Sequence, residues 1–293
     1  MNLGEGYIEG NLLAYLGTLA ATVLIWCINR KVMTGLIYNE INKVEDTKVK
    51  TVSEYRFLER YGEVGEYMRL ELKMLLRNKR CKASLRSVAM LVIIFSIILS
   101  FSSTYDHMKS FVLVYSFLGF GMVILIQLMG FEGNYIDGLM TRKESIKSLL
   151  TAKYYIYSLA EIIPLILLIP AFVMGKASLL GAVALIFLTT GPVYCILFQL
   201  AVYNHKTVPL NESITGKQST NSGMQMLISL GVFIVPTTLY GTLPMLLGQT
   251  WAYIVILIIG LGFTLTSPMW INNVYVRFMQ RRYENMEGFR DSK

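Results

Sequence analysis

Residues 131–153 read FEGNYIDGLMTRKESIKSLLTAK, a polar and charged insert between two long apolar runs. The runs cover residues 110–130 and 154–174. Each is about the length that a helix needs to cross a bilayer, roughly 20 residues. The insert is therefore predicted to be a partly helical loop on one face of a membrane.

The composition indicates a membrane protein. The 293 residues are 54% hydrophobic and 16% charged, whereas soluble domains carry about 25% charged residues. The three cysteines (Cys27, Cys81 and Cys195) lie far apart, and the chain has two histidines. This pattern predicts neither a disulfide framework nor a zinc or His-based metal site.

Seven apolar runs predict an all-α, polytopic integral membrane protein with about seven transmembrane helices. They cover residues 11–28, 87–103, 110–130, 154–174, 179–203, 223–243 and 251–272. The first run precedes Arg30 and Lys31, whereas a cleaved signal peptide has its positive charge before the apolar core. We therefore expect a membrane helix there.

The distribution of lysine and arginine predicts the orientation. Alternate connecting segments hold 25 of the 27 basic residues, and they are residues 30–86, 131–153, 204–222 and 273–293. Basic residues favour the cytoplasmic side, so the N-terminus is predicted outside and the C-terminus in the cytoplasm. Only Lys109 and Lys176 fall outside. The net charge of +8 then requires no nucleic-acid partner.

An amphipathic helix is predicted from about residue 52. One face is apolar and another is basic: Val64, Met68, Leu72, Leu75 and Leu76 against Arg69, Lys73, Arg77 and Arg80. Such a helix can lie in the inner headgroup layer. The alternative is a solvated helix packed on another cytoplasmic element.

Glu161 lies inside the apolar run 154–174. An ionisable group in a span is costly and marks a pathway, a proton site or a buried pairing. Gln127 and Gln199 are candidate hydrogen-bond partners if their helices pack against it. Structural hydrogen bonding and a functional role both remain open for this carboxyl.

Two other segments have compositions that bear on function. Residues 211–218 resemble a P-loop, but Asn211 and Gln218 stand where that loop needs Gly and Ser or Thr. We therefore expect no ATP hydrolysis by this chain. The uncharged connection 240–250 mixes Gly and Pro with apolar residues, and it is predicted to dip back into the outer leaflet.

The loop carries a resemblance to the first cytoplasmic loop of ABC-2-type exporter permeases. The matching residues are Glu132, Asp137, Gly138, Leu139, Met140, Ser145, Leu149, Ala152 and Lys153. The preceding run from Tyr67 to Arg80 is similar to the elbow helix of such modules, especially in an uncharacterised bacterial branch. The resemblance covers about residues 60–275.

The resemblance implies a division into four parts: an N-terminal helix (1–29), a basic linker with the elbow helix (30–86), a six-span permease-like module (87–275) and a basic cytoplasmic tail (276–293). The extra first span departs from the family pattern. We therefore expect a shortened or C-terminal version of such a permease. The bacterial cytoplasmic (inner) membrane is the implied location.

The resemblance also implies a function for residues 131–153. They would form a coupling helix that docks on a cytoplasmic ABC ATPase subunit, which holds ATP-Mg, while the permease itself binds no cofactor. The implied docking residues are Glu132, Tyr135, Asp137, Leu139, Met140, Arg142, Lys143 and Glu144. A second permease module, identical or not, completes the pathway.

Three alternatives remain. The segment 131–153 could be a solvated connecting loop. The protein could be a membrane-embedded lipid-modifying enzyme using Glu161 as acid or base. It could also be a non-transporting membrane scaffold.

Overall fold

The computed structural model describes residues 12–41, 55–101, 108–140, 143–204, 206–208 and 223–292. All regular structure in these ranges is helical, as the sequence predicts. The chain divides into two compact units, residues 1–54 and 55–293.

The first unit contains one long helix, α2 (Leu12–Ile41). The predicted apolar run ends at residue 28, but the helix continues through Arg30 and Lys31. No proline interrupts it, and proline is the residue that most strongly stops a helix. The Arg30 guanidinium lies 5.6 Å from the centroid of the Trp26 ring. The apolar stretch therefore ends at an aromatic and basic pair.

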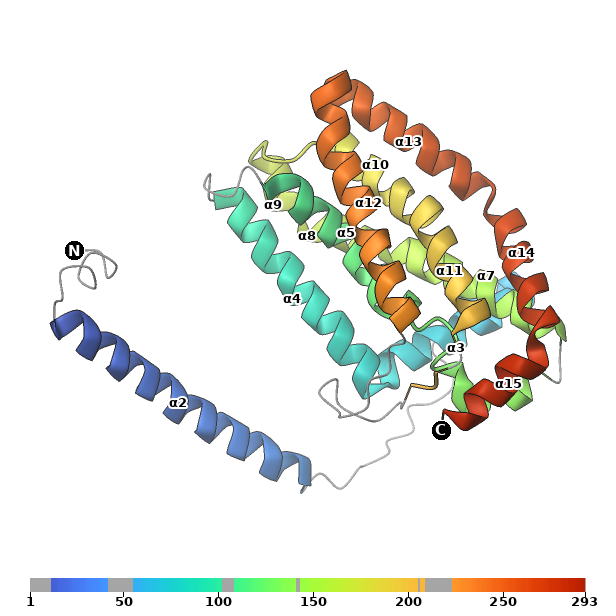
Figure 1. Cartoon of the computed structure of the whole chain (residues 1–293), viewed down its shortest axis with the longest axis horizontal. Helices are drawn as coiled ribbons and strands as arrows, with labels where there is room; N and C mark the ends of the chain where they lie inside the picture. The colour runs from blue at the N-terminus through green and yellow to red at the C-terminus, as the bar shows by residue number, and fades with distance from the viewer. Residues whose placement is uncertain are drawn as a thin grey trace. The chain divides into compact units, whose positions relative to one another are not determined.

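The second unit is a bundle of helices (Figure 1). Its elements in chain order are η1 (Arg56–Tyr61), α3 (Gly62–Arg77), α4 (Lys79–Phe101), α5 (Lys109–Leu125), η3 (Glu132–Tyr135), α6 (Ile136–Met140), α7 (Lys143–Ala160), α8 (Ile162–Leu167), α9 (Ile169–Val173), α10 (Leu179–Leu188), η4 (Thr189–Val193), α11 (Tyr194–Tyr203), α12 (Gly223–Leu247), α13 (Gln249–Leu265), α14 (Ser267–Gln280) and α15 (Arg282–Asp291).

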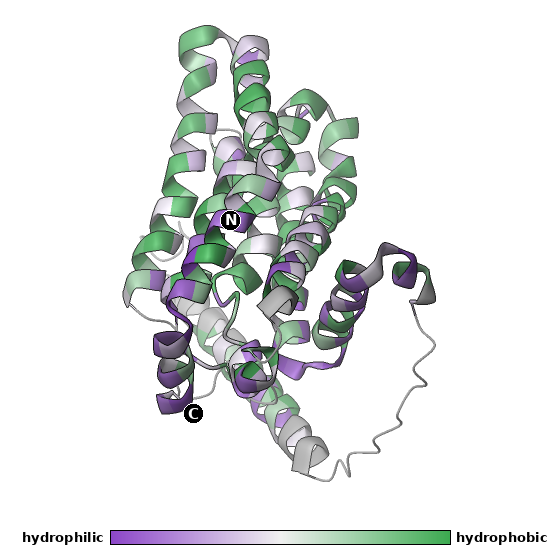
Figure 2. Cartoon of the chain, turned by 90° about the vertical axis from the view of Figure 1, so that its right-hand side faces the viewer, coloured by the Kyte–Doolittle hydropathy of each residue, from purple (hydrophilic) through white to green (hydrophobic). Residues whose placement is uncertain are grey.

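Several of these helices are long and apolar enough to cross a membrane. Within the described ranges, four qualify: Lys79–Phe101, Ile146–Leu167, Leu179–Tyr203 and Gly223–Leu247. The pair α13 and α14, bent by 53°, makes a fifth if it is one span. Helix α5 is apolar but has 17 residues. Figure 2 shows the apolar residues along the bundle and polar residues gathering near the C-terminus.

Proline residues explain where the spans break. Pro164 has no N–H to donate to the carbonyl of Ala160, and α7 and α8 are separated at Glu161. Pro192 lies inside a short π-helical stretch, η4, between α10 and α11. Both irregular places still lie within single helical stretches long enough to cross a membrane, Ile146–Leu167 and Leu179–Tyr203.

The connection 240–250 differs from its prediction. Instead of a loop that dips back, α12 continues to Leu247 and α13 begins at Gln249. Gly248 joins them with a φ of 78°, a backbone conformation that glycine adopts without steric cost. The two helices therefore form a tight hairpin.

Close helix contacts depend on glycines. A Cβ added at Gly260 would lie 2.5 Å from the Phe187 carbonyl carbon, and one at Gly121 would lie 2.2 Å from the Tyr194 hydroxyl. By contrast, a Cβ at Gly262 would meet nothing within 4 Å. The first two glycines thus allow the backbone of one helix to approach its neighbour.

Candidate functional site

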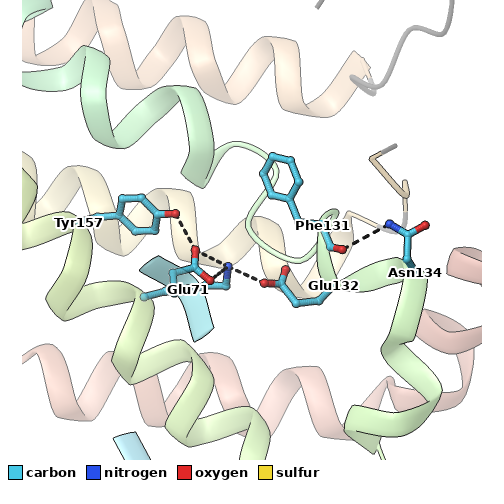
Figure 3. A network of polar contacts seen from close by, with 6 residues as sticks. Glu71, Phe131, Glu132, Asn134 and Tyr157 are labelled. Atoms are coloured by element: carbon cyan, nitrogen blue, oxygen red, sulfur yellow. Dashed lines mark hydrogen bonds and ion pairs between the residues drawn. The ribbon is translucent and has the colours of Figure 1, made fainter. Parts of the chain in front are cut away.

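Three buried charged residues meet where the loop joins the bundle. Glu71 comes from α3, Glu132 from η3 and Lys153 from α7, and each is at most 2% exposed. The Lys153 Nζ lies 2.9 Å from both carboxylate oxygens of Glu71 and 2.7 Å from Glu132 Oε1. Figure 3 shows Glu132 on one side of Glu71 and Tyr157 on the other. One ammonium group therefore holds three segments together.

The balance of charge in this cluster is uneven. Two carboxyl groups share one lysine, and the second oxygen of Glu132 has no hydrogen-bond partner. Burial raises the pKa of Glu132 to about 7; the Glu71 carboxylate acts in the same direction, and the Lys153 ammonium opposes both. Glu132 therefore takes up a proton more readily than an exposed glutamate does, and a proton there reduces the excess negative charge.

A line of polar side chains continues from the cluster along α7. Lys153, Tyr157 and Glu161 are spaced four residues apart and so share one helix face. The Tyr157 hydroxyl donates to Glu71 Oε1 at 2.6 Å. The Tyr194 hydroxyl, on α11, lies 2.6 Å from Glu161 Oε1.

The Tyr194 hydroxyl also lies 3.2 Å from the backbone carbonyl oxygen of Tyr157. We call the six residues Glu71, Glu132, Lys153, Tyr157, Glu161 and Tyr194 the polar seam. All of them are buried. The seam leads from the loop to the break between α7 and α8.

The expected partners of Glu161 were wrong. Tyr194, not a glutamine, donates to this carboxyl. Gln199 instead accepts a hydrogen bond of 2.8 Å from Arg277 Nη1, because α11 packs against α14. Gln127 is nearly buried just after α5. The sequence offers one signal for Tyr194, a polar side chain two positions after Pro192 in an apolar run. It offers no signal that Glu161 is the partner of Tyr194.

The predicted docking residues lie in different environments. Tyr135 is 49% exposed, and Leu139 and Met140 are half-buried against the core. Asp137 forms a 2.9 Å ion pair with Arg290. The prediction that Glu132 is a docking residue is wrong. Its side chain is 1% exposed and its carboxylate is ion-paired with Lys153, so it cannot contact a partner protein.

Three other docking candidates stay undetermined. Arg142 lies outside the described residues, as do the side chains of Lys143 and Glu144, although the backbone of the latter two opens α7.

The predicted tail is a packed helix. Phe289 of α15 is fully buried, and a Cβ added at Gly133 would lie 2.7 Å from its ring. The backbone N–H of Thr207 donates to the Ser292 hydroxyl at 3.0 Å. Helix α15 therefore packs against η3 and α6, and its Phe289 is part of the hydrophobic core.

The amphipathic helix is confirmed, and it packs against α7. Met68 and Leu75 are buried, whereas Leu76 of the predicted apolar face is 50% exposed. Arg69 forms an ion pair of 2.5 Å with Glu59. Of the other predicted basic residues, Lys73 is half-buried and Arg77 is exposed, whereas Arg80 lies in α4.

The described side chains include no group of three or more His, Cys, Asp or Glu residues placed to hold a metal ion. The chemistry of the site is thus that of a buried ion cluster and tyrosine hydroxyls.

The chain belongs to the DUF5687 family, described as a family of unknown function, whose model matches residues 2–292. No curated protein and no solved structure matches the chain.

Proposed function

We propose that this chain, as a member of that family, is the membrane permease subunit of an ABC-type transporter, most simply an exporter. A separate cytoplasmic ATPase subunit binds ATP-Mg and docks on the loop that contains α6. In this proposal α2 is the first of seven spans in a bacterial inner membrane, with the N-terminus outside. A second permease module completes the pathway.

The polar seam is the observation that carries the proposal. A coupling loop must transmit a push from its surface into the spans. Here Glu132, at the base of the loop, is ion-paired to Lys153 near the start of α7. Lys153 is also paired to Glu71 of α3. Because separating buried charges is costly, a force on α6 moves α3 and α7 with it.

The break at Glu161 gives this movement a place to act. Helix α7 ends at Ala160 and α8 begins at Ile162, so the inner part of the span can tilt while the outer part stays packed. Such hinge motions between packed helices are a common way to alter access to a pathway.

The order of elements also supports the proposal. An amphipathic helix with a basic flank comes first, then two apolar helices separated from the next by a charged loop. The resemblance to ABC-2 permeases rests on the same order.

The lipid-modifying enzyme is less favoured by the geometry. Glu161 has no exposed surface, and its nearest polar partner is a tyrosine that already donates to it. A catalytic carboxyl must reach its substrate. The scaffold alternative is decided by the experiment below.

Affinity purification of the native protein in a mild detergent tests the proposal. We expect a soluble ATPase with a P-loop to co-purify, and Tyr135→Asp to reduce its recovery at least fivefold, because Tyr135 is exposed on the loop. Tyr61→Asp is the control, since Tyr61 is also exposed (58%) but lies in η1. Recovery of no ATPase, or equal recovery with both variants, would overturn the proposal and favour a scaffold.

A further inference from the structure

A small pocket lies beside the buried ion cluster. Its volume is about 50 Å³, and residues of α3, η3, α6 and α7 enclose it. Leu70 of α3 and Tyr135 of η3 line it and are 56% and 49% exposed, so it opens at the surface. A cavity needs about 10–15 Å³ to hold a group the size of a water molecule. This pocket therefore has room for an ammonium group and a few methylene groups.

The base of the pocket carries more negative than positive charge. Glu71 and Glu132 both line it, and no lysine or arginine is among the described residues that do. The Lys153 ammonium is paired with both carboxyl groups, so it balances one of the two negative charges. An unbalanced buried charge is costly, and a cation in the pocket would remove that cost.

One carboxylate oxygen can accept a hydrogen bond from such a cation. Glu132 Oε2 has no hydrogen-bond partner, although the side chain is 1% exposed. The backbone N–H of Glu132 also acts on this carboxyl, but an N–H group carries no formal charge. Both oxygens of Glu71 already accept from Lys153. The pocket therefore offers Glu132 Oε2 to a charged N–H donor, the kind of contact that is stronger than a neutral hydrogen bond.

The walls of the pocket favour one kind of cation. Apart from the two glutamates, the lining is apolar or aromatic: Tyr67, Leu70, Met74, Tyr135, Leu139 and Leu149. Hard metal ions such as Mg²⁺ and Ca²⁺ take about six or more oxygen ligands, which this lining does not supply. An alkylammonium group places its charge on a carboxylate and its methylene groups on apolar surface. The pocket therefore fits an organic ammonium better than a metal ion.

We propose that this pocket binds a primary alkylammonium group. The ammonium donates to Glu132 Oε2 and balances the second carboxylate, while the methylene groups contact Leu70, Tyr135 and Leu139. The source is a lysine side chain of another protein or a free small amine, which share this chemistry. The site consists of residues of this chain alone, so binding to the purified protein is tested separately from the recovery of an ATPase.

Saturation-transfer difference NMR on the purified full-length protein in a non-ionic detergent tests the site. The probe is n-butylammonium, which has the shape of a lysine side chain, and it is compared with tetramethylammonium at constant ionic strength. We expect n-butylammonium to bind about tenfold more tightly, because tetramethylammonium carries the same charge but has no N–H to donate. Equal binding by the two cations would overturn the proposal, and so would displacement of n-butylammonium by an equal concentration of potassium ions.

A third ligand separates the two sources. N-acetyl-lysine methylamide carries the same ammonium on a peptide backbone, with its other amine blocked. Binding as tight as that of n-butylammonium assigns the pocket to a lysine of a docked protein. Much weaker binding assigns it to a free amine, because the backbone then prevents entry.

A substitution makes the result specific. We expect Glu132→Gln to weaken n-butylammonium binding about tenfold, because the cluster then keeps one carboxylate for one lysine. Glu66→Gln is the matched control, since Glu66 is an exposed carboxylate of α3 that is not part of the lining, and we expect it to bind as the wild type does. Unchanged binding by a folded Glu132→Gln variant would overturn the proposal.

Should that variant fail to fold, the pH dependence of binding to the wild type provides a second test. A proton on Glu132 competes with the ammonium group, and the pKa of this carboxyl is about 7. The charged groups that act on it are Lys153 and Glu71. Its field also reaches Tyr135, Tyr157 and Cys81.

The alkylammonium probe keeps its own charge in this range, so its binding should weaken severalfold as the pH falls from about 8 to about 6. Binding that stays constant over this range would likewise overturn the proposal.

Discussion

Replacing Lys153 by methionine tests the buried ion cluster directly. The Lys153 Nζ lies within 2.9 Å of three carboxylate oxygens, and the residue is fully buried. Methionine fills similar space but leaves Glu71 and Glu132 facing each other without a counter-charge. Removing one partner of a buried ion pair costs about 3–5 kcal/mol, and we expect a loss of that size in the free energy of unfolding at pH 7.

The loss should depend on pH. Without the lysine, the two carboxyl groups avoid repulsion only by taking up protons, which is easier in acid. We therefore expect the Lys153→Met variant to recover part of its stability as the pH falls from 7 to 5. Adding Glu71→Gln and Glu132→Gln should restore most of it at pH 7, because the cluster then contains no charge.

Unfolding by SDS in mixed micelles, followed by tryptophan fluorescence, measures these free energies. Lys147→Met is the matched control: it lies on the same helix but is exposed, so its effect should be within about 0.5 kcal/mol. A Lys153→Met variant that differs from wild type by less than about 1 kcal/mol, or that matches the Lys147 control, would refute the account of the cluster.

Three further outcomes follow from the geometry. The pKa of Glu132 in the folded protein, about 7, lies above its usual value of 4.5, so the folded protein keeps this proton to a higher pH than the unfolded chain does. The free energy of unfolding should therefore fall by up to about 3 kcal/mol from pH 4.5 to 7. Unfolding of the Glu132→Gln variant, measured at several pH values, should lack this pH dependence. Gly121→Ala should destabilise by about 1–3 kcal/mol because its Cβ would displace the Tyr194 hydroxyl, whereas Gly262→Ala, with open space around it, should be near neutral in the same assay. Asp137→Asn should change stability by less than about 1 kcal/mol, as measured by SDS unfolding, since its ion pair with α15 is solvent-exposed.

Four or five of the seven predicted spans correspond to helices long and apolar enough to cross a membrane, and they were predictable because hydrophobicity and length are local properties. The run 179–203 coincides with the structural span Leu179–Tyr203. The amphipathic helix was equally visible, since its apolar spacing reports a buried face. The interruptions were less predictable, because a proline in an apolar run can bend, break or merely kink a helix.

The ion cluster was beyond sequence reasoning. Glu71 and Lys153 are separated by 82 positions, and no periodic pattern links α3 to α7. The sequence therefore predicts which face of α3 is apolar. It does not predict that Lys153 and Tyr157 of α7 contact Glu71 of α3. For the same reason the sequence predicts an accessible Glu132: a carboxylate in a polar loop is usually solvated, and only the fold places Lys153 against it.

The spacing of Lys153, Tyr157 and Glu161 has a consequence for the proposed mechanism. Lys153 and Tyr157 of α7 both contact Glu71 of α3, and Glu161, directly after α7, contacts Tyr194 of α11. A displacement of the loop must then either separate buried charges or carry the inner end of α7 with it. Since the first is costly and the helix is already broken at Glu161, the second path requires less free energy. The seam thus favours a rigid inner lever that bends at the middle of the span.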